Sequence, residues 1–237
     1  MLMHADFVCR LAEGLTQKQV KVAVIGDLTE EEAKAFVLGA DAAAGTAVDA
    51  AIAANAESWR GLIHMGLVET VPAGAASMWN EIYDRCGGNI GLSEECMIEA
   101  GVQGSWEAAL ETVVAGPRRA VRKGFSPRKM PERDVPPLWT REQWKTVLRF
   151  IVDAEHHAVL RSALEEALHT DGDDASGEDA LLSMVKYNLL TLRPASLLAR
   201  DLPLRVHGKK RGEVVTLPSP AHLWAAKELK EDGDLDA

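Results

Sequence analysis

A cluster of prolines near the middle of the chain limits what this sequence can fold into. Pro127, Pro131, Pro136 and Pro137 stand in a stretch without hydrophobic periodicity. Proline lacks the backbone N–H that a helix interior needs, and it pushes the residue before it toward extended backbone. We therefore predict an extended linker at residues 126–139, with a separately folded unit on each side.

Both sides of this linker favour helices. Hydrophobic residues make up 47% of the 237 residues and aromatic residues only 5%, and this composition favours helices over a β-sandwich. Thr29 and Glu32 form one predicted capping box, and Thr140 and Gln143 form a second. In a capping box each side chain bonds the backbone N–H of the other residue, so a helix is expected to begin after each threonine.

The order of these patterns predicts a mainly α fold with small β elements. Residues 1–28 are expected to form a β-α-β unit whose second strand is 21–26, and residues 29–125 a helical bundle. Residues 140–230 are expected to form a winged helix, and residues 231–237 an acidic, disordered tail.

Within the bundle, helices are predicted at residues 93–100 and 105–115, and the alanine-rich segment 40–57 is expected to be a weakly held insertion. Ser93 is the expected cap of the first of these helices. In the winged helix, a second helix is expected to hold the apolar residues from Val159 to Leu168.

The expected winged helix ends in a two-stranded hairpin that joins residues 202–206 to 212–217. Its turn is bounded by glycines and carries the cations Lys209, Lys210 and Arg211. We interpret these three side chains as a partner-binding site at the tip of the hairpin.

A tight turn is predicted at the sequence IYDRCGGNIG. An amphipathic helix is expected to end at Gly87 and Gly88, because glycine readily takes the left-handed backbone that closes a helix. Asn89 and Ile90 then turn the chain before the helix that Ser93 is expected to open.

Five segments resemble, in their order and spacing, the second half of an archaeal-type P-loop ATPase of the AAA+/STAND superfamily. They are MLMHADFVCRLAEGL, VIGDLTEEEAKAF, GGNIG, LLSMVKYNLLTLRP and VVTLPSPAHLWAA. The resemblance implies that residues 1–28 end the ATPase core, that 29–125 form the helical lid, and that 140–230 form the winged helix. Two departures are the isoleucine at position 90, where the family has proline, and the His4-Ala5 pair before Asp6.

The same resemblance implies a site for ATP or ADP. Gly87, Gly88, Asn89 and Ile90 would line the adenine pocket, and Asp6 would lie at the end of the preceding strand. No GxxxxGK[ST] motif exists in these residues, so the chain lacks the loop that cradles phosphates. We expect ATP or ADP only together with a missing N-terminal half or a partner, and no ATP hydrolysis by this chain alone.

The charge of the chain and its distribution along the sequence indicate which partners to expect. The net charge of −10 argues against general nucleic-acid affinity. A basic block at residues 117–133 faces an acidic segment at 165–179, so the block is either an internal docking surface or a site for nucleic acid or an acidic partner. Glu178 and Asp179 begin the helix where a base-reading protein needs Arg, Asn or Gln, so sequence-specific DNA binding is not expected. The expected partner is a protein, either the missing ATPase core or another subunit.

No catalytic residue and no metal site are predicted. Cys9, Cys86 and Cys96 are too irregularly spaced for a zinc site or a disulfide framework and are expected to be small core residues. Because the sequence has neither a signal peptide nor an apolar run of the ~18–20 residues that span a bilayer, we expect no membrane association. An intracellular, cytoplasmic location is expected, with an organelle or the nucleus as alternatives. Two other functions stay open: a winged-helix interaction module, or a truncated gene product without independent activity.

Overall fold

The structure is a computed structural model that describes residues 26–39, 56–130, 136–169, 176–197, 199 and 201–235. Asp6 and nearly all of the segments predicted at 1–28 and 40–57 lie outside this part of the chain. The described residues are mainly helical and contain one small three-stranded antiparallel sheet, which confirms the predicted fold class at that level. Within these residues, no helix combines the length and the apolar character that a membrane span requires.

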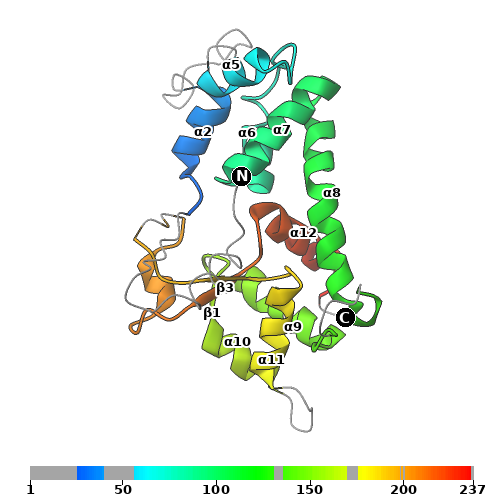
Figure 1. Ribbon diagram of the computed structural model, residues 1–237, viewed down its shortest axis with the longest axis vertical. Coiled ribbons are helices and arrows are strands. Elements are labelled where there is room, and N and C mark those ends of the chain that lie inside the picture. Colours follow the sequence, from blue (N-terminus) through cyan, green and yellow to red (C-terminus); the bar gives the residue numbers. More distant parts are fainter. Residues whose placement is uncertain are drawn as a thin grey trace.

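The first helices of the described chain form an upper bundle around a shared apolar core (Figure 1). They are α2 (Glu30–Leu38), α5 (Glu57–His64), α6 (Trp79–Cys86), α7 (Ile90–Gln103) and α8 (Trp106–Gly124). At its centre the buried rings of Trp59 and Trp106 meet edge to face, with centroids 6.0 Å apart. The indole N–H of Trp59 donates to the carbonyl of Val37 over 2.9 Å, so this buried donor has an acceptor.

Both predicted capping boxes are present. Thr29 Oγ1 accepts from the backbone N–H of Glu32 over 3.3 Å, and Glu32 Oε2 accepts from the N–H of Thr29 over 3.0 Å. Thr140 and Gln143 make the same reciprocal pair over 3.2 and 2.8 Å. The helices after these caps, α2 and α9 (Arg141–Asp153), therefore begin where the sequence predicts.

Two helix boundaries predicted in the upper bundle are wrong. Helix α7 begins at Ile90 because Asn89 takes the N-cap, and Ser93 is buried inside the helix. Helix α8 continues beyond residue 115 to Gly124 although it contains Pro117. Its last turns are held because Val121 and Gly124 are buried against the lower part of the molecule.

The lower unit follows α8. Its elements are η1 (Pro127–Lys129), α9 (Arg141–Asp153), β1 (Val159–Leu160), α10 (Arg161–Leu168), α11 (Gly177–Lys186), β2 (Thr191–Arg193), η2 (Leu204–His207), β3 (Val214–Thr216) and α12 (Pro220–Glu231). Strand β3 lies between β1 and β2, and both pairings are antiparallel. Fully buried Val215 of β3 is opposite Val159 on one side and Leu192 on the other.

The predicted hairpin of 202–206 with 212–217 is wrong. Residues Leu204–His207 form the short helix η2, and β3 pairs instead with strands far away in the sequence. Val159 also leaves the predicted second helix and enters β1. The reason is that β3 buries all three of its side chains, which a two-stranded hairpin could not cover.

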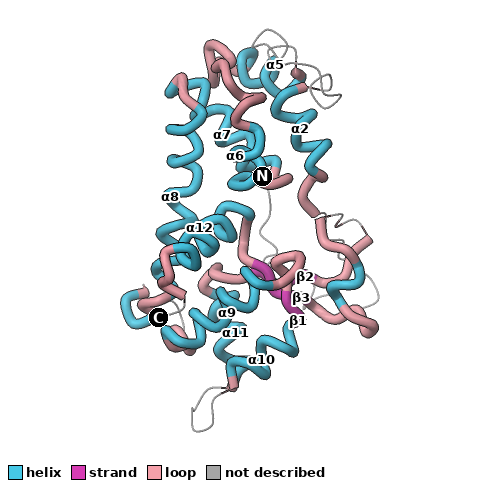
Figure 2. Tube along the Cα trace, turned by 180° about the vertical axis from the view of Figure 1, so that it is seen from behind, coloured by secondary structure: helices cyan, strands magenta, loops and turns pink. Residues whose placement is uncertain are grey.

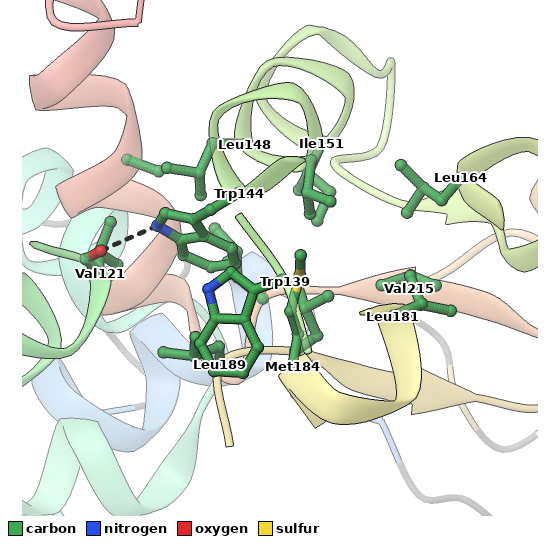
Figure 3. Close-up of a cluster of buried hydrophobic side chains, with 14 of the residues drawn as sticks. Val121, Trp139, Trp144, Leu148, Ile151, Leu164, Leu181, Met184, Leu189 and Val215 are labelled. Carbon is green, nitrogen blue, oxygen red and sulfur yellow. Dashed lines mark hydrogen bonds between the residues drawn. The ribbon is translucent and has the colours of Figure 1, made fainter. Parts of the chain in front are cut away.

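Helix α8 belongs to both cores. Val113 lies in the core of the upper bundle, and Val121, two turns further on, lies in that of the lower unit. The indole N–H of Trp144 donates to the carbonyl of Val121 over 3.0 Å (Figure 3), and that of Trp139 donates to the carbonyl of Gly124 over 3.0 Å. These bonds fix the end of α8 to the lower unit.

Helix α12 lies between the upper bundle and the rest of the lower unit, where it packs against α6, α8 and α9 (Figures 1 and 2). Beyond it, contrary to the predicted disorder of the tail, Leu235 is fully buried and its carbonyl accepts from the Arg149 side chain. The predicted linker also differs, because η1 interrupts its extended course.

Candidate functional site

The turn at Gly87, Gly88 and Asn89 connects α6 to α7, and its geometry follows from the sequence. Gly87 has a positive φ of 56°, and its N–H donates to the carbonyl of Tyr83 over 2.7 Å to close α6. Asn89 Oδ1 then accepts from the N–H of Leu92 over 3.0 Å and opens α7.

Both glycines lie against other segments of the chain. A Cβ atom on Gly88 would stand 1.9 Å from the carbonyl oxygen of Leu28, whose N–H donates to the Gly88 carbonyl over 2.8 Å. A Cβ on Gly87 would stand 2.6 Å from Cγ of Pro220, the first residue of α12. The turn thus joins the segment before α2 to the start of α12, and we call this meeting point the junction.

A polar network surrounds the junction. Asn89 Nδ2 donates to Asp27 Oδ1 over 3.3 Å. Arg193, at the end of β2, makes two bonds to the carboxylate of Asp201, of 2.6 and 2.9 Å. Burial raises the pKa of Asp27, and the negative charge of Asp201 raises it further, while Arg193 and Asn89 lower it. Asn89, Arg193 and Asp201, which are all distant from Asp27 in sequence, therefore set its charge environment.

An aromatic pair stands beside these carboxylates. The rings of Trp79 and Tyr83 are stacked, with centroids 5.6 Å apart, and the Trp79 indole donates to Glu30 Oε1 over 3.3 Å. Burial raises the pKa of the Tyr83 hydroxyl, as do the charges of Glu30, Asp27 and Asp201. These contacts and pKa shifts assign no catalytic role to the described residues at the junction.

The predicted nucleotide-binding residues can now be placed. Gly87, Gly88, Asn89 and Ile90 follow one another at the junction, while Asp6 lies outside the described residues. Both ends of the Asn89 side-chain amide are already bonded, and both glycines are covered by protein. Ile90 alone of these four presents a large exposed side chain, with 48% of its surface open to solvent.

The predicted partner-binding cations lie in a closed loop rather than at a hairpin tip. The buried His207 contacts the carbonyl of Gly212 through Nδ1 at 2.9 Å, and the Gly212 N–H donates to the His207 carbonyl over 2.9 Å. Lys209, Lys210 and Arg211 are exposed, and none makes an ion pair within the described residues. We call residues 208–211 the basic loop.

The acidic segment does not pair with the basic loop in the described structure. Its residues Glu165 and Glu178 bond Arg161, each over 2.6 Å, and Glu213 joins the same guanidinium over 2.9 Å. These carboxylates therefore pair with Arg161, and the three cations of the basic loop are exposed to solvent.

One further contact was not predicted from the sequence. Trp224 of α12 contacts two guanidinium groups, that of Arg85 at 4.8 Å and that of Arg118 at 5.2 Å from its ring centroid. Arg118 also donates two hydrogen bonds to the carboxylate of Glu228 of α12, over 2.9 and 3.2 Å. These residues are far apart in sequence, and no local pattern signals that they meet.

Cys86 and Cys96 are the cysteines that the structure describes. Both are free and buried, and their mutual hydrogen bond, together with burial, raises the pKa of Cys86. Within the described residues no group of three or more His, Cys, Asp or Glu could hold a metal ion. Comparison with protein-family models gave no match, and comparison with curated proteins and with solved structures gave no significant one.

Proposed function

We propose that this chain is the lid and winged-helix portion of a AAA+/STAND-like ATP-binding protein. The upper bundle would be the lid, and residues 140–230 the winged helix. The observation that carries the proposal is the junction, where the Gly87-Gly88 turn packs between Leu28 and Pro220. Because both units contact this turn, a nucleotide that binds at the turn would change the angle between the two units.

The order of elements supports the winged-helix assignment. Three helices, α9 to α11, are joined by a small antiparallel sheet, and the basic loop precedes the central strand β3. The exposed residues of α11 include Glu178, Asp179 and Leu182, which suit a protein surface better than the base edges of DNA.

The residues present fit an adenine ring only in part. The glycines and Asn89 are occupied, so the exposed Ile90 is the residue we assign to the base, by apolar contact. The sequence holds no phosphate loop, since GKKRG at 208–212 lacks the required spacing. ATP or ADP would therefore be held with phosphate-binding residues from the missing N-terminal half or a partner.

The test titrates a fluorescent ADP analogue into the chain, alone and joined to a P-loop segment encoded upstream. We expect tight binding only in the joined protein, and neither protein half alone to release phosphate from MgATP. Ile90→Asp should weaken binding at least tenfold, whereas Val102→Asp, at a more exposed site near the other end of α7, should leave it unchanged. The lack of any upstream GxxxxGK[ST] segment, or equal effects of the two variants, contradicts the proposal.

A second candidate function is docking of an acidic protein surface by the basic loop. The observation that favours it is the set of three exposed cations without an ion pair in the described structure. Three phosphate contacts would bind a duplex only weakly, in the non-specific range of ~10⁻⁴–10⁻⁶ M.

Replacing Lys209, Lys210 and Arg211 by alanine should weaken binding of a separately produced ATPase core or of a second subunit, measured by sedimentation at physiological salt. Sub-micromolar, sequence-dependent binding of DNA that is lost in this triple variant would overturn the docking function.

A further inference from the structure

A second cationic surface lies at the lower end of α8, remote in sequence from the basic loop. Its members are exposed side chains from α8, η1 and the first residue of α9: Arg119, Arg122, Lys123, Arg128, Lys129 and Arg141. We call these six residues the α8 patch. Arg119, Arg122 and Lys123 follow an i, i+3, i+4 spacing and so share one face of the helix.

The α8 patch is not an internal docking surface. Arg118, its neighbour, is the member of the basic block that turns inward, to Glu228 and Glu111. None of the six patch residues makes an ion pair with any residue that the structure describes. The interpretation of the basic block as an internal docking surface therefore holds for Arg118 alone among its described members.

Contacts to buried side chains fix the elements that carry the α8 patch. The indoles of Trp139 and Trp144 bond the last carbonyls of α8, and the Arg141 guanidinium lies 5.9 Å from the ring centroid of Phe125. Cations attached to fixed elements lose less conformational freedom on binding than cations on a loose segment.

Helix stabilisation does not explain the patch. Arg122 and Lys123 lie in the last turn of α8, where a positive charge is favoured by the helix dipole by about 0.3–1 kcal/mol. Arg141 is the first residue of α9, where the same dipole disfavours a positive charge. The residues of η1 have no such dipole to complement.

The surroundings of the patch indicate what it binds. Val102 and Leu138 are exposed, and between these two positions the described residues expose no large hydrophobic side chain. Protein interfaces have an apolar centre depleted of charge, whereas a surface of Lys and Arg side chains can bind phosphate groups without an apolar centre. The net charge of −10 includes acidic residues concentrated at 165–179, outside the patch, and salt screens charges beyond about 8 Å at physiological ionic strength.

We propose that the α8 patch binds the phosphate backbone of a nucleic acid without reading its sequence. This inference is independent of the nucleotide site at the junction. Six phosphate contacts on duplex DNA would give a slope of about −5 in a plot of log affinity against log salt concentration, and a smaller slope on a single strand.

The test measures fluorescence anisotropy of labelled random-sequence DNA duplex and of single-stranded RNA, with the full chain at several salt concentrations. The triple variant Arg119→Gln, Arg122→Gln, Lys123→Gln should weaken binding at least tenfold and reduce the slope on duplex by about 3. The double variant Arg128→Gln, Lys129→Gln should reduce it by about 2, and it leaves α8 intact. The matched control is the alanine triple in the basic loop, which removes the same charge and should change affinity less than threefold.

Three results would overturn the proposal. They are no binding at low salt, equal losses in the α8 triple and in the basic-loop control, and tighter binding of a poly-glutamate peptide of matched charge. The last would assign the α8 patch to an acidic protein partner instead. Circular dichroism of each variant separates a loss of binding from a loss of folding.

Discussion

At the scale of single residues, Gly88 is a position with little freedom to change. It is buried between α6 and α7, and the space for a Cβ is already filled by the backbone of Leu28. A clash with backbone cannot be relieved by rotating a side chain, so the junction itself would have to open.

Gly88→Ala should therefore lower the free energy of unfolding by about 1–3 kcal/mol, the usual cost of overpacking. The control is Gly116→Ala in α8, where nothing lies within 4 Å of the added Cβ. Alanine there should raise stability by about 0.5–1 kcal/mol because it favours a helix. Urea unfolding of both variants decides, and equal effects would mean that the Leu28 contact is not tight.

His222 is a residue whose charge affects stability, because burial disfavours its protonated form. It lies in the first turn of α12, Ser219 Oγ contacts its Nδ1 at 2.7 Å, and burial lowers its pKa to about 4. The unfolded chain binds a proton near the ordinary value of 6.5. The neutral form is thus favoured by folding, and its contribution is complete above pH 6.5.

We expect that contribution to be lost as the pH falls from about 6.5 to about 4, by up to about 3 kcal/mol. Asp27, whose pKa is raised, acts in the opposite direction near the lower end of this range. Between pH 7 and pH 5, the free energy of unfolding should therefore fall less steeply in His222→Gln than in the unchanged protein. A parallel pH dependence in the two proteins would show that His222 is not buried in its neutral form.

At the scale of elements, α12 joins the two units through Trp224. The guanidinium groups of Arg85 of α6 and Arg118 of α8 both lie over its ring. Arg85 Nε is buried without a hydrogen-bond partner among the described residues, so the face of the indole is the main contact offered to this end of the guanidinium. Cation–π contacts of this kind contribute about 0.5–1 kcal/mol where solvent has access.

Trp224→Ala should destabilise the protein by more than Trp224→Phe, which keeps an aromatic face. A double-mutant cycle of Trp224→Ala with Arg85→Ala should give a coupling energy of about 0.5–1 kcal/mol. Thermal or urea unfolding of the four proteins measures it. A coupling energy of zero would show that the contact between Trp224 and Arg85 does not stabilise the protein.

At the scale of the whole molecule, two cores share one helix. Helix α8 contributes Val113 to the upper core and Val121 to the lower one, so the two units are packed together through this helix. The exposed cations of η1 are nevertheless the first accessible sites for trypsin in the predicted linker.

Limited trypsin digestion should cut first after Arg128 or Lys129 and leave a C-terminal fragment of roughly a hundred residues, within the range of a single domain. Because Trp139 and Trp144 bond α8 on the other side of the cut, the two fragments should stay together in gel filtration and separate only on a denaturing gel. First cuts within 141–168 would contradict the assignment of the lower unit.

Local sequence was enough for features whose partners lie within one turn of helix. The capping boxes at Thr29 and Thr140 and the glycine end of α6 need only residues three or four positions apart, so their patterns predicted them. The mainly helical fold follows from the same local preferences.

The junction, the sheet and the end of α8 were decided by tertiary structure. Asn89 meets Asp27 across 62 positions, and Val215 pairs with Val159 and Leu192 rather than with its neighbours in the chain. Helix α8 passes Pro117 because distant tryptophans cover its last turns. Such contacts depend on which surfaces the folded units bury against each other, and the periodicity of one segment contains no information about its distant partner.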